Sequence, residues 1–157
     1  MKKNIELKGF TLVELIVVIA IIGVLAAILV PSMLGYVTKA KLSSINSSAK
    51  TLYNAAMTAC REEDIEHPIP SGIYSGSGSQ GTQVNDILCE HIYEYFPKLN
   101  ECTWAVEIQS DCPVASCLQK NAGDGYVGTH PKPNNERDAF GGDGVVSFSS
   151  ALEFAKS

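Results

Sequence analysis

Residues 8–31 read KGFTLVELIVVIAIIGVLAAILVP, and this stretch decides the fold of the chain. From Phe10 to Val30 the only charged residue is Glu14. As a helix, the run would be about 30 Å long at 1.5 Å per residue, which matches the hydrocarbon core of a bilayer. Basic residues before an apolar run keep that end in the cytoplasm, and three lysines stand there: Lys2, Lys3 and Lys8. The stretch therefore predicts one membrane-spanning helix with an exported C-terminal part.

Two simpler interpretations of this run are a cleaved secretory signal and a plain membrane anchor. A cleaved secretory signal has an apolar region of about 7–15 residues that ends in a small-residue A-x-A site. The run from Leu15 to Val30 is longer than that, and Leu25-Ala26-Ala27 offers no clear A-x-A site. A plain membrane anchor explains the length and the orientation. It does not explain Glu14, because a charge within a membrane-spanning helix is costly.

Glu14 needs a positively charged partner. It lies only about 6 Å along the helix axis from Phe10, which reduces the cost of its burial. A cut between Gly9 and Phe10 would create an α-amino group, which is cationic near neutral pH. Residues four apart share a helix face, so the new charge would lie on the side of Glu14. The cation could come from the same chain or from a neighbouring copy.

The segment Gly9-Phe10-Thr11-Leu12-Val13-Glu14, placed after a short basic leader and before a long apolar run, resembles a type IV prepilin. The resemblance covers about the first third of the chain. It implies that a prepilin peptidase cuts after Gly9 and that the same enzyme class N-methylates Phe10. It also implies that Glu14 pairs with the amino terminus of a neighbouring subunit during filament assembly. The chemistry is thus done to this protein, and we expect neither an enzyme nor a cofactor.

The helical pattern continues beyond Pro31 with a different character. Apolar or small residues recur at spacings of three and four, which is typical of a one-sided amphipathic helix: Thr38, Leu42, Ile45, Ala49, Leu52, Ala56 and Ala59. We expect one helix from about Phe10 to Cys60. Gly23 and Pro31 weaken it, and the resemblance implies a bend or melting there. The expected parts are a leader (1–9), a transmembrane and filament-core half (10–31), and an amphipathic half with a soluble head (32–157).

The remaining residues predict a small α+β head. Residues 64–82 are rich in Pro, Gly and Ser and indicate a loop. A short helix is expected from Val84 to Phe96, ended by Pro97. Alternation predicts a strand at Cys102–Gln109. After a turn, Val114–Leu118 is expected as the returning strand, and two further candidates are Gly125–Thr129 and Val145–Ser149. An antiparallel sheet of these strands would pack on the amphipathic half-helix and bury both apolar faces.

The chain contains five cysteines and several possible metal ligands. All five cysteines follow the apolar run, which is consistent with an exported, oxidising location and one or two disulfides: Cys60, Cys89, Cys102, Cys112 and Cys117. Connectivity stays open, with Cys112–Cys117 as a first guess. Oxygen ligands for calcium occur at Asp124, Asn134, Asn135, Asp138 and Asp143, but their spacing does not match an EF-hand loop. His67, His91 and His130 are far apart and lack a Cys-x-x-Cys pair, so no metal site is predicted.

The sequence favours a structural subunit of an extracellular type IV pilus, polymerised through its N-terminal helix. The alternative is a pseudopilin of a type II secretion or competence system, because the N-terminal motif is shared. Expected partners are other copies of the chain, the prepilin peptidase, the pilus assembly machinery and, before assembly, the lipid bilayer. Adhesion or motility would follow from such a filament. The formal net charge of −5 and the lack of a basic stripe argue against nucleic acid.

Overall fold

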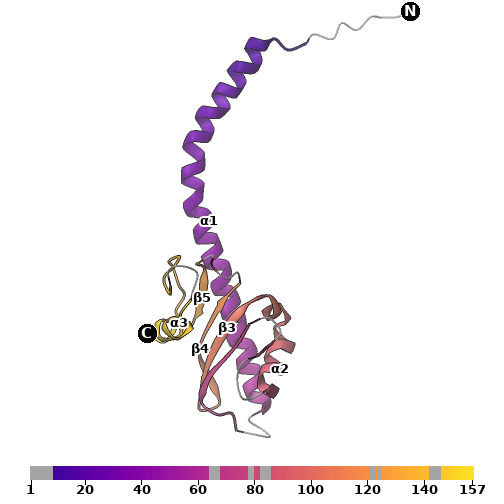
Figure 1. Ribbon diagram of the computed structural model, residues 1–157, viewed down its shortest axis with the longest axis vertical. Helices are drawn as coiled ribbons and strands as arrows, with labels where there is room; N and C mark the ends of the chain where they lie inside the picture. Colours follow the sequence, from indigo (N-terminus) through magenta and orange to yellow (C-terminus); the bar gives the residue numbers. More distant parts are fainter. Residues whose placement is uncertain are drawn as a thin grey trace, which may run out of the picture. The chain divides into compact units, whose positions relative to one another are not determined.

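A computed structural model describes residues 9–63, 68–77, 80–81, 86–120, 123, 125–141 and 146–157. The chain falls into two compact units, one ending at Val37 and one beginning at Thr38. Helix α1 runs through both. Among its described residues the second unit also contains five strands, a 3-10 helix and two further helices, in the order β1, β2, α2, η1, β3, β4, β5 and α3 (Figure 1).

Helix α1 (Leu12–Glu63) confirms the expected long helix and continues through Gly23 and Pro31. Its residues up to Val37 are rich in Leu, Ile, Val and Ala, and their side chains are exposed in the isolated chain. From Thr38 onward only one face is buried, at the predicted three- and four-residue spacing: Leu42, Ile45, Ala49, Leu52, Ala56 and Ala59. The amphipathic pattern of the second half is therefore confirmed.

The sheet is antiparallel throughout, with the strand order β2-β1-β3-β4-β5. The strands are β1 (Gly72–Ser77), β2 (Gln80–Gly81), β3 (Thr103–Gln109), β4 (Cys112–Gln119) and β5 (Val127–His130). Strands β3 and β4 form a hairpin whose two turn residues, Ser110 and Asp111, both have positive φ. That backbone pattern is typical of a type I′ turn. Asp111 Oδ1 also accepts a 2.7 Å hydrogen bond from the backbone N–H of Ile69.

Strand β1 corrects the prediction of a loop over residues 64–82. Gly72–Ser77 pairs along its whole length with β3, although Gly and Ser are poor strand formers. Tyr74 is buried, and a Cβ on Gly76 would lie within 2.8 Å of the Trp104 indole nitrogen. Pairing with β3 and close packing under Trp104 therefore override local propensity. Residues 64–67, 78–79 and 82 of this predicted loop lie outside the described residues.

Helix α3 (Phe148–Lys156) corrects the prediction of a strand at Val145–Ser149. Ser147 is the N-cap, and its hydroxyl accepts a hydrogen bond from the Ser150 N–H at 3.4 Å. Ala151, Leu152 and Ala155 are buried at helical spacing. The apolar residues after Ser147 thus follow a period near 3.6 rather than 2, and a cap signal precedes them. Val145 itself lies outside the described residues.

The sheet separates two hydrophobic cores (Figure 1). One face, with Trp104, Val106 and Ile108, packs with α1 and α2 (Asp86–Tyr95). The other face, with Ala105, Ala115, Cys117 and Val127, packs with α3. Because successive strand residues point to opposite faces, the near-continuous apolar run Trp104-Ala105-Val106 supplies both cores. The short 3-10 helix η1 (Pro97–Glu101) follows α2 and buries Leu99.

Two features bring β5 against α1 within the second unit. A Cβ on Gly128 would overlap the carbonyl oxygen of Ile45, so the two backbones meet where only glycine fits. Asn46 then fixes the following loop through three hydrogen bonds. Its Nδ2 donates to the Asn134 carbonyl at 2.7 Å, and its Oδ1 accepts from the N–H groups of Thr129 at 3.0 Å and Asn134 at 3.2 Å.

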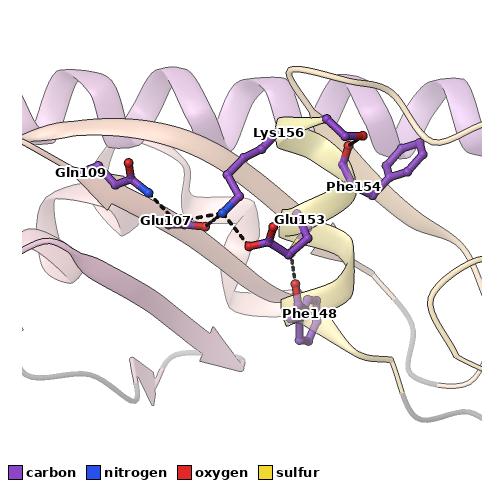
Figure 2. A network of polar contacts seen from close by, with 8 residues as sticks. Glu107, Gln109, Phe148, Glu153, Phe154 and Lys156 are labelled. Carbon is purple, nitrogen blue, oxygen red and sulfur yellow. Dashed lines mark hydrogen bonds and ion pairs between the residues drawn. The ribbon is translucent and has the colours of Figure 1, made fainter.

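Helix α3 is tied to the sheet by a polar network (Figure 2). Lys156 Nζ lies 2.9 Å from Glu107 Oε2 on β3 and 2.7 Å from Glu153 Oε1 on its own helix. Gln109 Nε2 donates to Glu107 Oε1 at 2.8 Å, which orients that carboxylate. The hydrogen bonds to Glu153 and then to Glu107 raise the pKa of the Lys156 ammonium. The ammonium is therefore held in its charged form between the two elements.

Candidate functional site

The start of α1 is built as a capping box. Thr11 is the residue before the helix, and Glu14 is the third residue within it. The backbone N–H and the hydroxyl of Thr11 donate to Glu14 Oε2 at 2.9 and 2.7 Å. In return the Glu14 N–H donates to Thr11 Oγ1 at 3.3 Å. The side chains thus satisfy backbone donors that a helix N-terminus leaves without an intrahelical partner.

This capping box gives Glu14 a second role that the sequence reasoning missed. The signal was present, because Thr-x-x-Glu before an apolar run is the sequence signature of such a box. In the single chain, Thr11 within the same molecule satisfies the carboxylate. Its predicted pairing with the amino terminus of a neighbouring subunit involves a second molecule and stays a prediction.

The predicted cleavage position lies just before this cap. Phe10 is 88 % exposed, and no atom lies within 4 Å of where a Cβ on Gly9 would be. Both residues precede the first helical residue, Leu12. The position is exposed and precedes the capped helix, and cleavage there stays a prediction. The leader residues Met1–Lys8 lie outside the described residues.

The first part of α1 presents apolar side chains on all sides. Every large apolar side chain from Leu12 to Val37 is between 47 % and 75 % exposed in the isolated chain. Among the described residues, α1 is the one helix that is long and apolar enough to cross a membrane, judged by length and composition. An all-round apolar helix needs lipid or other helices around it. This segment is therefore the surface for which the single chain provides no cover.

Gly23 and Pro31 lie within this segment, where a kink was predicted. The helix continues through both residues, and the hydroxyl of Ser32 donates to the Leu29 carbonyl at 2.8 Å. Proline supplies no N–H, so one intrahelical hydrogen bond is necessarily absent there. Bending or melting in a filament stays a prediction.

The cysteines do not support the first-guess disulfide. Cys112 and Cys117 both lie on β4, five residues apart, which is about 16 Å along a strand. Disulfide-bonded residues have Cα atoms less than about 7 Å apart, so this pairing is wrong. Burial raises the pKa of the Cys117 thiol, which faces α3, whereas Cys112 is exposed. Cys60, Cys89 and Cys102 lie in the core between α1, α2 and the sheet, and their oxidation state in the exported protein stays a prediction.

The oxygen ligands considered for calcium do not form a site in the described part of the chain. Asn134 is buried, and its side-chain amide bonds to the backbone of Val127 and Glu136. Asp138 lies 3.5 Å from the Arg137 guanidinium. Asp124 and Asp143 lie outside the described residues, as does His67. No group of three or more His, Cys, Asp or Glu side chains that could hold a metal occurs among the described residues.

Comparisons with known proteins agree with this reading of the N-terminus. A family model described as "Prokaryotic N-terminal methylation motif" matches residues 8–30. The chain is 42 % identical over 57 residues to the type IV major pilin protein PilA of Myxococcus xanthus, covering 36 % of this chain and 26 % of PilA. It is 36 % identical over 92 residues to a fimbrial protein of Pseudomonas aeruginosa, covering 50 % of this chain and 60 % of that protein.

A third relative is the type IV major pilin protein PilE of Neisseria gonorrhoeae, 34 % identical over 90 residues, with 54 % of this chain and 52 % of PilE covered. The chain thus spans between about a quarter and three fifths of the length of these three relatives. No solved structure matches it. The methylation motif, the relatives, and a long N-terminal helix followed by an antiparallel sheet together make the chain similar to type IV pilins.

Proposed function

We propose that the chain is a structural subunit of an extracellular type IV pilus. Before assembly it is a single-pass membrane protein with a cytoplasmic N-terminus and an exported head. The observation that carries the proposal is the exposed, all-round apolar segment from Leu12 to Val37. Lipid covers this segment in the membrane, and the same segments of other copies cover it in the filament. The matched relatives are named major pilins and fimbrial proteins, which favours a pilus over a pseudopilus.

The N-terminal residues have separate roles in this proposal. A prepilin peptidase cuts between Gly9 and Phe10, and Phe10 receives a methyl group on its new amino group. Glu14 then pairs with the cationic amino terminus of a neighbouring subunit, which fixes the axial register. A subunit without a docked neighbour keeps the carboxylate on Thr11. The filament is a passive polymer in this proposal, and the chain itself catalyses no reaction.

Peptide mass spectrometry on filaments sheared from the source cells tests the proposal. We expect abundant recovery of a peptide that begins at Phe10 and carries an added methyl group. Recovery of that peptide from membranes alone would point to the pseudopilin alternative. Recovery of an uncut Met1–Gly9 leader in the mature protein would contradict processing and leave a plain membrane anchor.

A further inference from the structure

The stretch of α1 from Thr38 to Cys60 carries an excess of positive charge. Between Thr38 and Cys60 the helix contains Lys39, Lys41 and Lys50 and no acidic residue. All three lysines are exposed, and the surface between them consists largely of serine hydroxyls. This part of α1 is therefore a cationic, hydroxyl-rich surface on a chain whose overall charge is negative.

Two grooves of about 710 Å³ each border this surface and share Ser47. The first is formed by α1 and the loop after β5; Lys39 and Lys50 line it, and no carboxylate does. The second is formed by α1, η1 and the end of β4; Lys41, Lys98 and Lys120 line it together with Glu101. Five lysines against one glutamate give these grooves a clear positive potential. We call them the cationic grooves.

The opposite charge gathers on α2 and the end of α1. Helix α2 carries Asp86, Glu90 and Glu94 and no lysine or arginine. Glu62, near the end of α1, joins this surface because its carboxylate accepts the Tyr95 hydroxyl at 2.6 and 2.7 Å. Glu62, Glu90 and Glu94 are exposed. We call these three residues the acidic surface; Arg61 is the basic residue next to it in sequence.

The two surfaces lie at different levels along α1. Thr51 is the last residue of α1 that lines either groove, and Glu62 follows it by eleven residues, which is about 16 Å along the helix axis. Within one copy, Glu62 cannot reach the grooves along α1. A second copy in the same orientation, displaced along the helix axis, can place its grooves beside the acidic surface of the first copy. Complementary patches at different places on one molecule produce heterologous contacts, which generate open helical polymers rather than closed dimers.

We propose that in the filament the acidic surface of one copy docks onto the cationic grooves of the next copy. The inference rests on the proposed pilus function and adds a head-to-head contact to the polymerisation through the N-terminal half of α1. The occupant is a second copy because the complementary charge is on this chain. Such contacts favour the correct register, since like-charge juxtaposition in other registers is costly.

Charge reversal and charge exchange in the full-length chain, expressed in cells that assemble the filament, test this contact. The groove variant is Lys41→Glu with Lys120→Glu, and the acidic variant is Glu90→Lys with Glu94→Lys. Each should reduce the sheared filament yield about tenfold or more, because the contact becomes repulsive. Combining all four changes should return the yield to within about threefold of the unmodified chain. The matched control is Glu136→Lys, whose side chain lines neither groove and is not part of the acidic surface, and it should leave the yield unchanged.

The outcomes separate the inference from the function on which it rests. If cells that express the unmodified chain formed no filaments, the proposed pilus function itself would be wrong. The docking contact alone would be wrong if either reversal variant formed normal filaments. It would also be wrong if the exchange variant kept the thermal melting profile of the unmodified chain but did not restore the filament yield.

A second measurement uses the unmodified chain and therefore does not depend on whether a variant folds. Raising the salt concentration should increase subunit release from sheared filaments, because salt screens exposed charges, and salt-independent release would contradict the proposal.

Discussion

The two halves of α1 have similar backbones and opposite surroundings. From Leu12 to Val37 the helix buries none of its large apolar side chains. From Thr38 to Glu63 it buries one apolar face against the sheet and exposes lysines and hydroxyls on the other. The first half therefore depends on other molecules to cover it, and the second half depends on its own chain.

This difference shows that helix formation and helix burial depend on different features of the sequence. Both halves contain good helix formers, and both have regular helical structure, even across Pro31. The identity of the residues between the apolar ones decides what surrounds each half. Uniform apolarity requires lipid or neighbouring helices, whereas one-sided apolarity is satisfied by a single sheet. Changes in the first half should affect assembly, and changes in the second half should affect folding.

The largest expected effect is on assembly. Replacing Glu14 by Ala should lower the filament yield by about a hundredfold or more, because removing one member of a buried ion pair costs about 3–5 kcal/mol. Glu14→Gln sharpens the test, since glutamine can still complete a capping box with Thr11 but carries no charge. We expect Gln to be as defective as Ala in electron microscopy of sheared filaments. Normal filaments with Gln would show that capping, and not charge pairing, is the role of Glu14.

A folding defect is expected where β5 meets the second half of α1. The new methyl group of Gly128→Ala would overlap the Ile45 carbonyl, so the variant should lose about 3 kcal/mol of unfolding free energy. Gly72→Ala is the matched control, because no atom lies within 4 Å of its Cβ position. Urea unfolding in detergent, followed by fluorescence of the single buried tryptophan, Trp104, measures both. Equal stability of the two variants would contradict the close approach.

A smaller loss is expected at Asn46. Asn46→Ala removes three hydrogen bonds to the backbone of Thr129 and Asn134, and we expect a cost of about 2–3 kcal/mol because part-buried donors lose their acceptor. Asn54→Ala on the same helix is the control, since Asn54 is exposed. The same unfolding measurement applies. If Asn46→Ala were as stable as Asn54→Ala, the side chain would not hold β5 and its loop against α1.

The smallest expected change in folding stability is at the end of α1, where Tyr95 bonds to Glu62. The hydrogen bond to Glu62 raises the pKa of Tyr95 from 10.0 to about 12. A raised folded-state pKa favours the protonated hydroxyl, so its contribution is fully present below pH 10 and is lost as the pH rises through about 12. The stability difference between the unmodified chain and Tyr95→Phe should therefore vanish across that window. A difference independent of pH would indicate that the hydroxyl does not bond to Glu62.

Much of the fold could be predicted because its signals are local. The apolar run and the later three-and-four spacing predicted α1, and alternation predicted β3. The turn after β3 predicted β4 as the returning strand, and most of β5 was a candidate strand. Strand β1 could not be predicted, because Gly72–Ser77 is a strand through pairing with β3 and not through propensity. Helix α3 was missed although Ser147 and the apolar spacing after it were visible. The Thr11–Glu14 cap was also missed, although Thr-x-x-Glu before an apolar run is its local signature.

The sequence alone determined that the apolar run from Phe10 to Val30 needs lipid or neighbouring helices around it, because uniform apolarity is a property of residue order. It also determined where cleavage is expected, at Gly9 and Phe10. Only the tertiary structure decided that β5 lies against α1 through Gly128 and Asn46, and that lysine and glutamate residues distant in sequence gather into separate grooves and surfaces. Those features depend on contacts between segments far apart in the chain, and no local pattern encodes such contacts.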